Sequence, residues 1–316
     1  MTLQRNSLAI PALCMALAAC TVVPPADREA QPQRQATVVQ PVVTPSPSPT
    51  PAPVPTPTPN PTPTGPTTFV FDGELTQGGW IRGQVPAGTA SARLGETELT
   101  LDEEGHFFAA FDRDAGPQDV LVAVLEDGRE VRSPLSIAPR DWNIERVNVA
   151  RRAGGASEAF MRRRQPELDA IWDARTANSD TRGWRQDFIW PVTGRISGRF
   201  GSQRIYRGEP GSYHSGIDIA PGAGTPFVAP ADGVVTLAVR DYSLEGNLII
   251  IDHGAGLNSA FLHAQDIFVS EGQRVSQGDR LGTVGASGRA TGPHLHWSLK
   301  WHLTRLDPIL FTGPMP

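Results

Sequence analysis

Residues 214–218 read HSGID and residues 292–296 read GPHLH, and these two stretches decide how the rest of the chain is interpreted. The first places a histidine and an aspartate four residues apart, and the second places two histidines two residues apart. Side chains alternate between the two faces of a β-strand, so even spacings put the members of each pair on one face. Gly216 leaves room for a bulky neighbour beside the first pair. Each pair is therefore expected to form one polar surface on a strand.

Five of the seven histidines fall in the same part of the chain: His214, His253, His263, His294 and His296. A buried imidazole costs free energy unless it is hydrogen-bonded, so packing alone explains such a set poorly. Nitrogen and oxygen donors without an available thiolate favour a catalytic zinc site, in which three protein ligands leave one position open. One or two histidines would then remain to handle protons.

The sequence around these histidines is rich in glycine and β-branched residues and shows no sustained helical periodicity. Six strand-sized apolar runs are present, at residues 188–190, 233–239, 247–252, 259–262, 281–284 and 295–299. An all-β domain over residues 186–316 is therefore predicted, which is a usual domain size.

As a set, the motifs of this domain resemble the signature of the LytM/lysostaphin-type peptidases, and the similarity extends over residues 190–310. Besides HSGID and GPHLH it includes GRFG at 198–201, TPFVAPADG at 225–233, IIDHG at 250–254 and VSQGD at 275–279. The resemblance implies a catalytic domain with the glycyl-glycine endopeptidase-like fold. It also implies a zinc endopeptidase that hydrolyses the stem-peptide cross-links of peptidoglycan.

Carried over residue by residue, the resemblance makes His214, Asp218 and His296 the zinc ligands. It makes His263 and His294 catalytic histidines, without deciding which of them is the general base. His253 has no catalytic role in the family and is expected to cap a turn. One position departs from the family pattern, because Phe261 stands where a tyrosine is usual. If that hydroxyl holds substrate, specificity changes; if the ring only packs, nothing changes.

A second interpretation from another class is a non-catalytic envelope protein that activates a cell-wall amidase. Relatives of that kind lack some of the ligand side chains, whereas this chain retains all five residues of the site. The bond that is cut stays open, because Gram-negative members suggest a D-alanyl–diaminopimelyl bond and lysostaphin relatives cut glycine bridges. Envelope regulatory proteins are possible partners in either case.

The N-terminal residues read as a lipoprotein signal. Residues 1–19 contain Arg5 followed by an apolar run too short to span a bilayer. The run closes in LAAC at residues 17–20, which resembles a bacterial lipobox and predicts a lipid on Cys20. Thr21 resembles the outer-membrane sorting choice of Gram-negative lipoproteins. We therefore expect a periplasm-facing protein anchored to the outer membrane.

Three further segments precede the catalytic domain. Residues 20–68 are rich in proline and threonine and predict an extended polyproline II spacer. Residues 69–140 contain short apolar runs separated by turn signals, which predict a small β-sandwich with a structural His106. Residues 141–185 predict a largely helical connector, with Pro166 in the first turn of a helix. The expected fold class is mainly β.

Composition excludes some partners. The net charge is −5, and no cluster of basic and aromatic residues suggests nucleic-acid binding. The arginine run at 162–164 is expected to be a solvated helix face. Arginine supplies every basic side chain except Lys300, the one lysine of the chain. The only cysteines are Cys14, within the signal, and Cys20, so the mature chain is expected to fold without a disulfide.

Overall fold

The computed structural model describes residues 64–150 and 157–316. The predicted signal, Cys20 and nearly all of the predicted spacer lie outside these residues. No helix in the described ranges is both long and apolar enough to cross a membrane. The fold is mainly β, which confirms the fold class predicted from the sequence.

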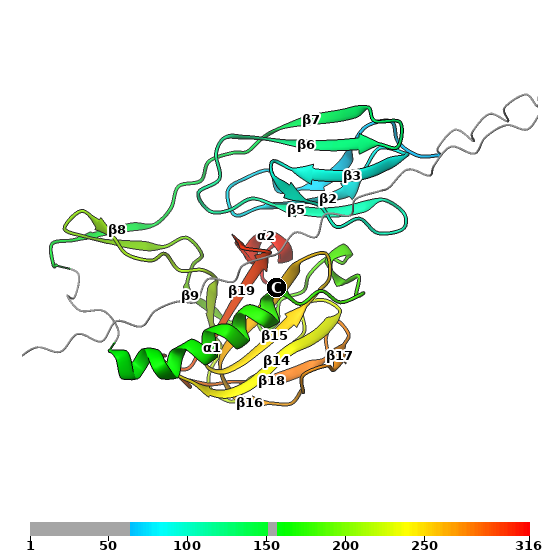
Figure 1. Cartoon of the computed structure of the whole chain (residues 1–316). Helices are drawn as coiled ribbons and strands as arrows, with labels where there is room; N and C mark the ends of the chain where they lie inside the picture. The colour runs from blue at the N-terminus through cyan, green and yellow to red at the C-terminus, as the bar shows by residue number, and fades with distance from the viewer. Residues whose placement is uncertain (1–63, 151–156) are drawn as a thin grey trace, which may run out of the picture. The chain divides into compact units, whose positions relative to one another are not determined.

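The small N-terminal β-sandwich consists of two antiparallel sheets (Figure 1). The first has the order β1-β2-β5, with β1 at Val70–Gly73, β2 at Trp80–Gln84 and β5 at His106–Ala110. The second has the order β4-β3-β6-β7, with β3 at Thr89–Leu94, β4 at Thr97–Glu98, β6 at Gln118–Leu125 and β7 at Glu130–Ser136. Ile81, Phe107 and Leu121 are fully buried and supply a core from both sheets.

The connector contains β8 (Ile144–Val147), the helix α1 (Glu158–Thr176) and a 3-10 turn, η1 (Gly183–Arg185). The Oγ of Ser157 caps α1 by accepting the main-chain N–H of Phe160 at 3.2 Å. The prediction that Pro166 opens the helix is wrong, because Pro166 lies inside it. The cap at Ser157 sets the start of α1 instead, one turn of helix or more before the proline.

One side of α1 packs across strands β14 and β15 of the C-terminal sheet (Figure 1). Ile171 and Ala174 of α1 share a small apolar cluster with Leu248, Ile250 and Ala260. Two other apolar residues of α1, Leu168 and Trp172, are exposed.

The arginine run of α1 is only partly a solvated face. Arg162 and Arg163 are exposed, but the side chain of Arg164 is 7% exposed. Its two terminal nitrogens bind the Glu245 carboxylate at 2.6 and 2.7 Å. The prediction is therefore wrong for Arg164, because a carboxylate from a distant turn compensates its charge.

The C-terminal domain is built on one large antiparallel sheet, whose main path runs β17-β14-β15-β16-β19-β12-β9. Its elements are β9 (Arg195–Gly198), β12 (Ile217–Ala220), β13 (Pro226–Val228), β14 (Gly233–Tyr242), β15 (Gly246–Asp252), β16 (Leu257–Ile267), β17 (Arg274–Val275), β18 (Arg280–Val284), β19 (Leu295–Trp301), β20 (Thr304–Leu306) and the short helix α2 (Ile309–Thr312). A separate small sheet joins β10 (Gln203–Tyr206) to β11 (Glu209–Pro210) and, in parallel, to β8 of the connector. Five of the six predicted strands are present, whereas residues 188–190 form none.

The sandwich and the C-terminal domain belong to one compact unit and share side-chain contacts. Trp80 of β2 donates its indole N–H to the Leu310 carbonyl at 3.0 Å. Phe108 of β5 packs on Phe311 with ring centroids 6.2 Å apart. Arg140 binds Asp307, whose side chain is 3% exposed, at 2.7 Å. A fragment limited to residues 186–316 would therefore expose apolar surface that the sandwich covers.

Candidate active site

Strand register brings together the three residues predicted to bind zinc. Asp218 of β12 lies directly opposite His296 of β19, and His214 lies in the extended segment before β12. The Oδ1 atom of Asp218 lies 2.8 Å from Nδ1 of His296 and 3.1 Å from Nε2 of His214. Those two nitrogens are 3.1 Å apart. The three donor atoms therefore converge on one point.

The donor set fits a metal ion of the zinc class. Two imidazole nitrogens and one carboxylate oxygen lie within 4.8 Å of one another. Tetrahedral zinc with bonds of about 2.0–2.1 Å places its ligand atoms about 3.3 Å apart, close to the separations found here. The side chains of His214, Asp218 and His296 are 25%, 21% and 11% exposed, so the described residues leave the donor set partly accessible.

The carboxylate of Asp218 is held in its ionised form. Burial alone would disfavour the charge, but hydrogen bonds from His214 and His296 outweigh it and keep the pKa of Asp218 well below its ordinary value. Burial also works against charge on His214, yet its bond to Asp218 raises the pKa of that imidazole. Burial lowers the pKa of His296. A neutral His296 beside an ionised Asp218 is the state that a metal requires.

His263 reaches the site through an irregularity of β16. Strict alternation would place its side chain on the same face as Phe261, away from His296. The pairing of β16 with β15 shifts register, and His263 has a φ of +66°, a conformation that non-glycine residues rarely adopt. Its ring centroid lies 4.9 Å from that of His294 and 6.4 Å from that of His296. The bulge thus directs the imidazole towards the metal centre.

Main-chain carbonyls orient three of the histidines. Nδ1 of His263 donates to the Ser287 carbonyl and Nδ1 of His294 to the Gly292 carbonyl, both at 2.8 Å. Nδ1 of His214 similarly donates to the Arg199 carbonyl at 3.2 Å. Because a carbonyl only accepts, Nδ1 carries the proton in each neutral ring, and the lone pair of Nε2 can then act as a base or a ligand.

These carbonyl partners were not found from the sequence, because a main-chain contact depends on the path of the chain and not on the residue type. Nε2 of His294 lies 3.7 Å from Oδ1 of Asp218. Burial, followed by the nearby imidazoles, lowers the pKa of His263 although its bond to Ser287 opposes this. A neutral His263 is suited to accept a proton.

Two glycines allow the strands to approach closely at the site. A Cβ on Gly198 would lie 2.3 Å from Oδ2 of Asp218, and a Cβ on Gly216 would lie 2.4 Å from the Trp297 carbonyl. The space beside Gly216 predicted from the sequence is therefore occupied by β19 itself. Any larger residue at either position would displace a ligand or its strand.

The Phe261 departure has a structural answer. Phe261 is fully buried and its ring stacks on Phe227, with centroids 5.6 Å apart. It lies opposite Trp297 on the core side of the sheet, while His296 projects from the other face. The ring therefore packs in the core and does not contact a substrate at the metal centre.

His253 lies outside the cluster and is fully buried. Its two ring nitrogens bind the Asp232 carbonyl at 2.8 Å and Oγ of Ser259 at 2.7 Å. Burial lowers the pKa of His253 to about 4. These contacts give it a structural role beside the turn that follows β15.

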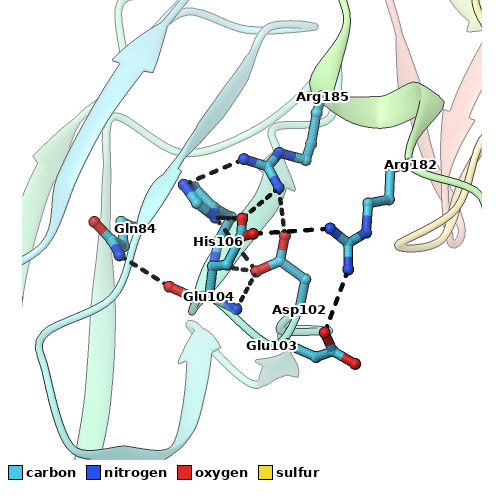
Figure 2. A network of polar contacts seen from close by, with 7 residues as sticks. All are labelled: Gln84, Asp102, Glu103, Glu104, His106, Arg182 and Arg185. Carbon is cyan, nitrogen blue, oxygen red and sulfur yellow. Dashed lines mark hydrogen bonds and ion pairs between the residues drawn. The ribbon is translucent and has the colours of Figure 1, made fainter.

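A second group with metal-compatible donors lies in the sandwich, where Asp102, Glu104 and His106 bring one ligand atom each within 4.8 Å of one another. Figure 2 shows the side chains of Arg182 and Arg185 directed at these carboxylates. Arg185 binds Glu104 at 2.8 Å and Asp102 at 3.0 Å. The arginines already compensate the negative charges, so this group is an ion-pair network that ties the sandwich to η1.

Comparisons with known proteins agree with this geometry. Residues 212–308 match the model described as Peptidase family M23. The peptidoglycan DD-endopeptidase ShyA of Vibrio cholerae serotype O1 is 41% identical over 109 residues, which are 33% of this chain and 24% of that protein. The cell division protein DipM of Caulobacter vibrioides is 34% identical over 120 residues, which are 38% of this chain and 19% of that protein. The chain thus spans about a quarter or less of these curated relatives.

A solved structure extends the similarity beyond the matched segment. It is a crystal structure of a candidate peptidase M23 from Pseudomonas aeruginosa, with 28% identity and a TM-score of 0.58. The match covers 76% of this chain and 96% of that one, so it includes residues outside 212–308. Together with the converging histidines and aspartate, these similarities confirm the family resemblance: the chain carries a peptidase family M23 domain.

Proposed function

We propose that this protein is a zinc-dependent endopeptidase that hydrolyses peptide cross-links of peptidoglycan. The observation that carries the proposal is the convergence of His214, Asp218 and His296 beside two further imidazoles, each oriented by a main-chain carbonyl at its Nδ1 atom. The name of the Vibrio cholerae relative, a peptidoglycan DD-endopeptidase, supports the same substrate class and a D,D-bond.

The five residues of the site would have two roles, metal binding and proton transfer. His214, Asp218 and His296 would hold the zinc, which supplies Lewis-acid polarisation of the scissile carbonyl and activation of water when bound. His263 and His294 would accept and return protons and donate to the developing oxyanion. The carbonyls of Ser287 and Gly292 fix the two rings for this role.

The test uses the chain from Cys20 to its end, carrying Cys20→Ser for solubility, because the sandwich covers part of the catalytic domain. The zinc-loaded protein is incubated with isolated sacculi, and the released fragments are identified by mass. Loss of cross-linked fragments and gain of their uncross-linked halves is the expected result. The masses also identify the bond that is cut.

The same experiment distinguishes the non-catalytic alternative. The name of the Caulobacter vibrioides relative, a cell division protein, states no peptidase activity and leaves this alternative to be tested. A zinc-loaded protein that leaves every cross-link intact, yet increases glycan-chain release by an added cell-wall amidase, would establish the regulator and exclude the enzyme.

We also propose that Cys20 carries a lipid that holds the protein on the outer membrane, facing the periplasm. The lipobox-like sequence at residues 17–20 and the proline-rich segment after it support this. Two acyl chains already give stable anchoring at about 0.8 kcal/mol per buried methylene. Cys20→Ser should move the full chain from the membrane fraction to the soluble fraction. A soluble wild-type protein would contradict the proposal.

A further inference from the structure

The only lysine of the chain lies on the strand that carries a predicted zinc ligand. His296, Ser298 and Lys300 occupy alternate positions of β19 and therefore project from the same face of the sheet. Lys300 is paired with Arg305 of β20 across the strand, so two cations stand side by side. The strand rise of about 3.3 Å per residue places the Cα of Lys300 about 13 Å from that of His296.

A third cation approaches from the helix that covers this face. Arg175, near the end of α1, donates to Oδ1 of Asn258 at 2.5 Å and to Oγ of Ser298 at 3.1 Å. Asn258 is the partner of Lys300 on β16. Arg175 therefore lies over β19 between Lys300 and the metal centre, where it binds the buried side chains of Asn258 and Ser298. All three cations are partly exposed.

No carboxylate in the part of the chain that the structure describes lies within 4.0 Å of a side-chain nitrogen of Arg175, Lys300 or Arg305. Asp112 is near, but its Oδ2 accepts the main-chain N–H of Arg305 at 3.1 Å. The guanidinium of Arg305 lies over the ring of Tyr213, 5.3 Å from its centroid. Within residues 64–150 and 157–316, the Nε of Arg175 is buried and has no hydrogen-bond partner.

This arrangement works against the stability of the fold. Like charges directly opposite each other in a sheet are destabilising, as Lys300 and Arg305 are here. Burial, with Arg175 and Arg305 adding to it, lowers the pKa of Lys300 to about 8. Burial also lowers the pKa of Arg175 to about 10, and Arg305 contributes. An anion bound here would offset the repulsion between these cations and would favour the charged form of Lys300.

We propose that Lys300, supported by Arg175 and Arg305, binds a carboxylate of the peptide substrate about two to four residues from the bond held at the metal centre. The inference rests on the proposed function, since it assumes a wall peptide lying along β19. A compact ammonium flanked by two guanidiniums fits a single carboxylate. The cluster would thus favour acidic stem peptides over amidated ones.

The single lysine makes the test direct. Zinc-free chain from residue 20, with Cys20→Ser, is labelled with carbon-13 at lysine Cε and gives one lysine signal, that of Lys300. Its pH titration is followed alone, with cross-linked muropeptides, and with the same muropeptides after their carboxylates are converted to amides. A carboxylate at the ammonium is expected to raise the pKa of Lys300 by about one unit or more, whereas the amides should not.

Variants give an independent measurement of affinity by titration calorimetry. Lys300→Gln should weaken muropeptide binding about tenfold or more, whereas Lys300→Arg should retain it. Arg162→Gln removes the same charge from the exposed side of α1 and should leave binding unchanged. Lys300→Gln should melt no lower than the wild type, because it removes a repelled charge.

Two outcomes separate this proposal from the proposed function. Equal affinity for acidic and amidated muropeptides, with no change in the Lys300 pKa, overturns the carboxylate site even if zinc-loaded protein cuts sacculi. A preference for acidic muropeptides that Lys300→Gln abolishes supports the site even if no cross-link is cut.

Discussion

Two groups of histidine and carboxylate side chains in this protein have similar donor spacing but different surroundings. His214, Asp218 and His296 form one group, and Asp102, Glu104 and His106 form the other, each with donor atoms within 4.8 Å. Among the described residues, the only basic side chains within 4.0 Å of Asp218 are imidazoles. Arg185 lies within 3.0 Å of both carboxylates of the second group.

The difference shows that donor spacing alone does not identify a metal site. In the sandwich, the positive charge that the carboxylates require comes from the protein itself. At the M23 site the described residues offer Asp218 imidazoles in place of guanidiniums, and imidazole nitrogens with a carboxylate oxygen are a donor set that suits a metal ion. The same comparison supports a structural role for His106, because the two carboxylates beside it are paired with Arg185.

Replacing Asp218 is expected to have the largest effect. Asp218→Asn removes the one charged ligand, and even residues that only orient ligands are worth about 10–100-fold in metal affinity. Zinc affinity should fall by more than about 100-fold, and cross-link cleavage should fall with it. Zinc stoichiometry of the purified variant and turnover on sacculi measure the two effects.

The matched control is Asp102→Asn in the arginine-compensated group. It should keep the full zinc content and cleavage of the wild type. Zinc lost from Asp102→Asn and kept by Asp218→Asn would reverse the assignment of the two groups.

The next effect separates the ligands from the proton-handling histidines. His263→Ala and His294→Ala should keep most of the zinc but lose about 100- to 10,000-fold in cleavage, the usual worth of general acid–base catalysis. His296→Ala should lose both. If His294→Ala loses zinc while His296→Ala retains it, the two imidazoles have exchanged roles.

His253 sharpens the comparison by showing what burial does to an imidazole whose ring nitrogens bind a main-chain carbonyl and a hydroxyl. Its folded pKa of about 4 lies below the unfolded value of about 6.5, so the unfolded chain binds the additional proton between these values. The stability that this histidine contributes is present above pH 6.5 and is lost as the pH falls towards 4, by up to about 3 kcal/mol.

The measurement is urea unfolding of the wild type and of His253→Gln at pH 7.5, 6, 5 and 4.5. The free-energy difference between the two proteins should shrink as the pH falls. A constant difference would mean that His253 does not stay neutral in the fold.

The smallest effect is expected from the ion-pair network of Figure 2. Arg185→Gln leaves Asp102, whose side chain is 9% exposed, with fewer partners. The loss should be about 1–2 kcal/mol, or about 2–6 °C in melting temperature, with zinc content unchanged. Arg129→Gln, which breaks an exposed pair with Asp127, is the control and should change stability by less than about 1 kcal/mol. Zinc loss in Arg185→Gln would show that the two groups are coupled.

Local pattern predicted much of the architecture. Five of the six predicted strands of the C-terminal domain form, because alternation and turn residues act over a few neighbours. The chain at 188–190 is strand-like in composition but lies against other segments without joining a ladder. The predicted start of α1 at Pro166 was wrong because the capping hydrogen bond at Ser157, and not the proline, decides where the helix begins.

The sequence by itself determined which residue types are available for chemistry and where they cluster. The even spacings within HSGID and GPHLH predicted four of the five candidate site residues, and the family resemblance of the whole domain added His263. Tertiary structure decided how those side chains are directed. Strand alternation would turn His263 into the core, but a bulge with positive φ brings it to His294.

Tertiary structure also decided which charges are compensated. Arg164 forms an ion pair with Glu245, and Asp102 forms one with Arg185. Lys300 instead lies opposite another cation, Arg305. The first two pairs join residues about 80 positions apart, and the third depends on how β19 and β20 pair. Periodicity is a property of neighbours along the chain, whereas charge compensation depends on strand register and packing, which are fixed only when distant segments meet.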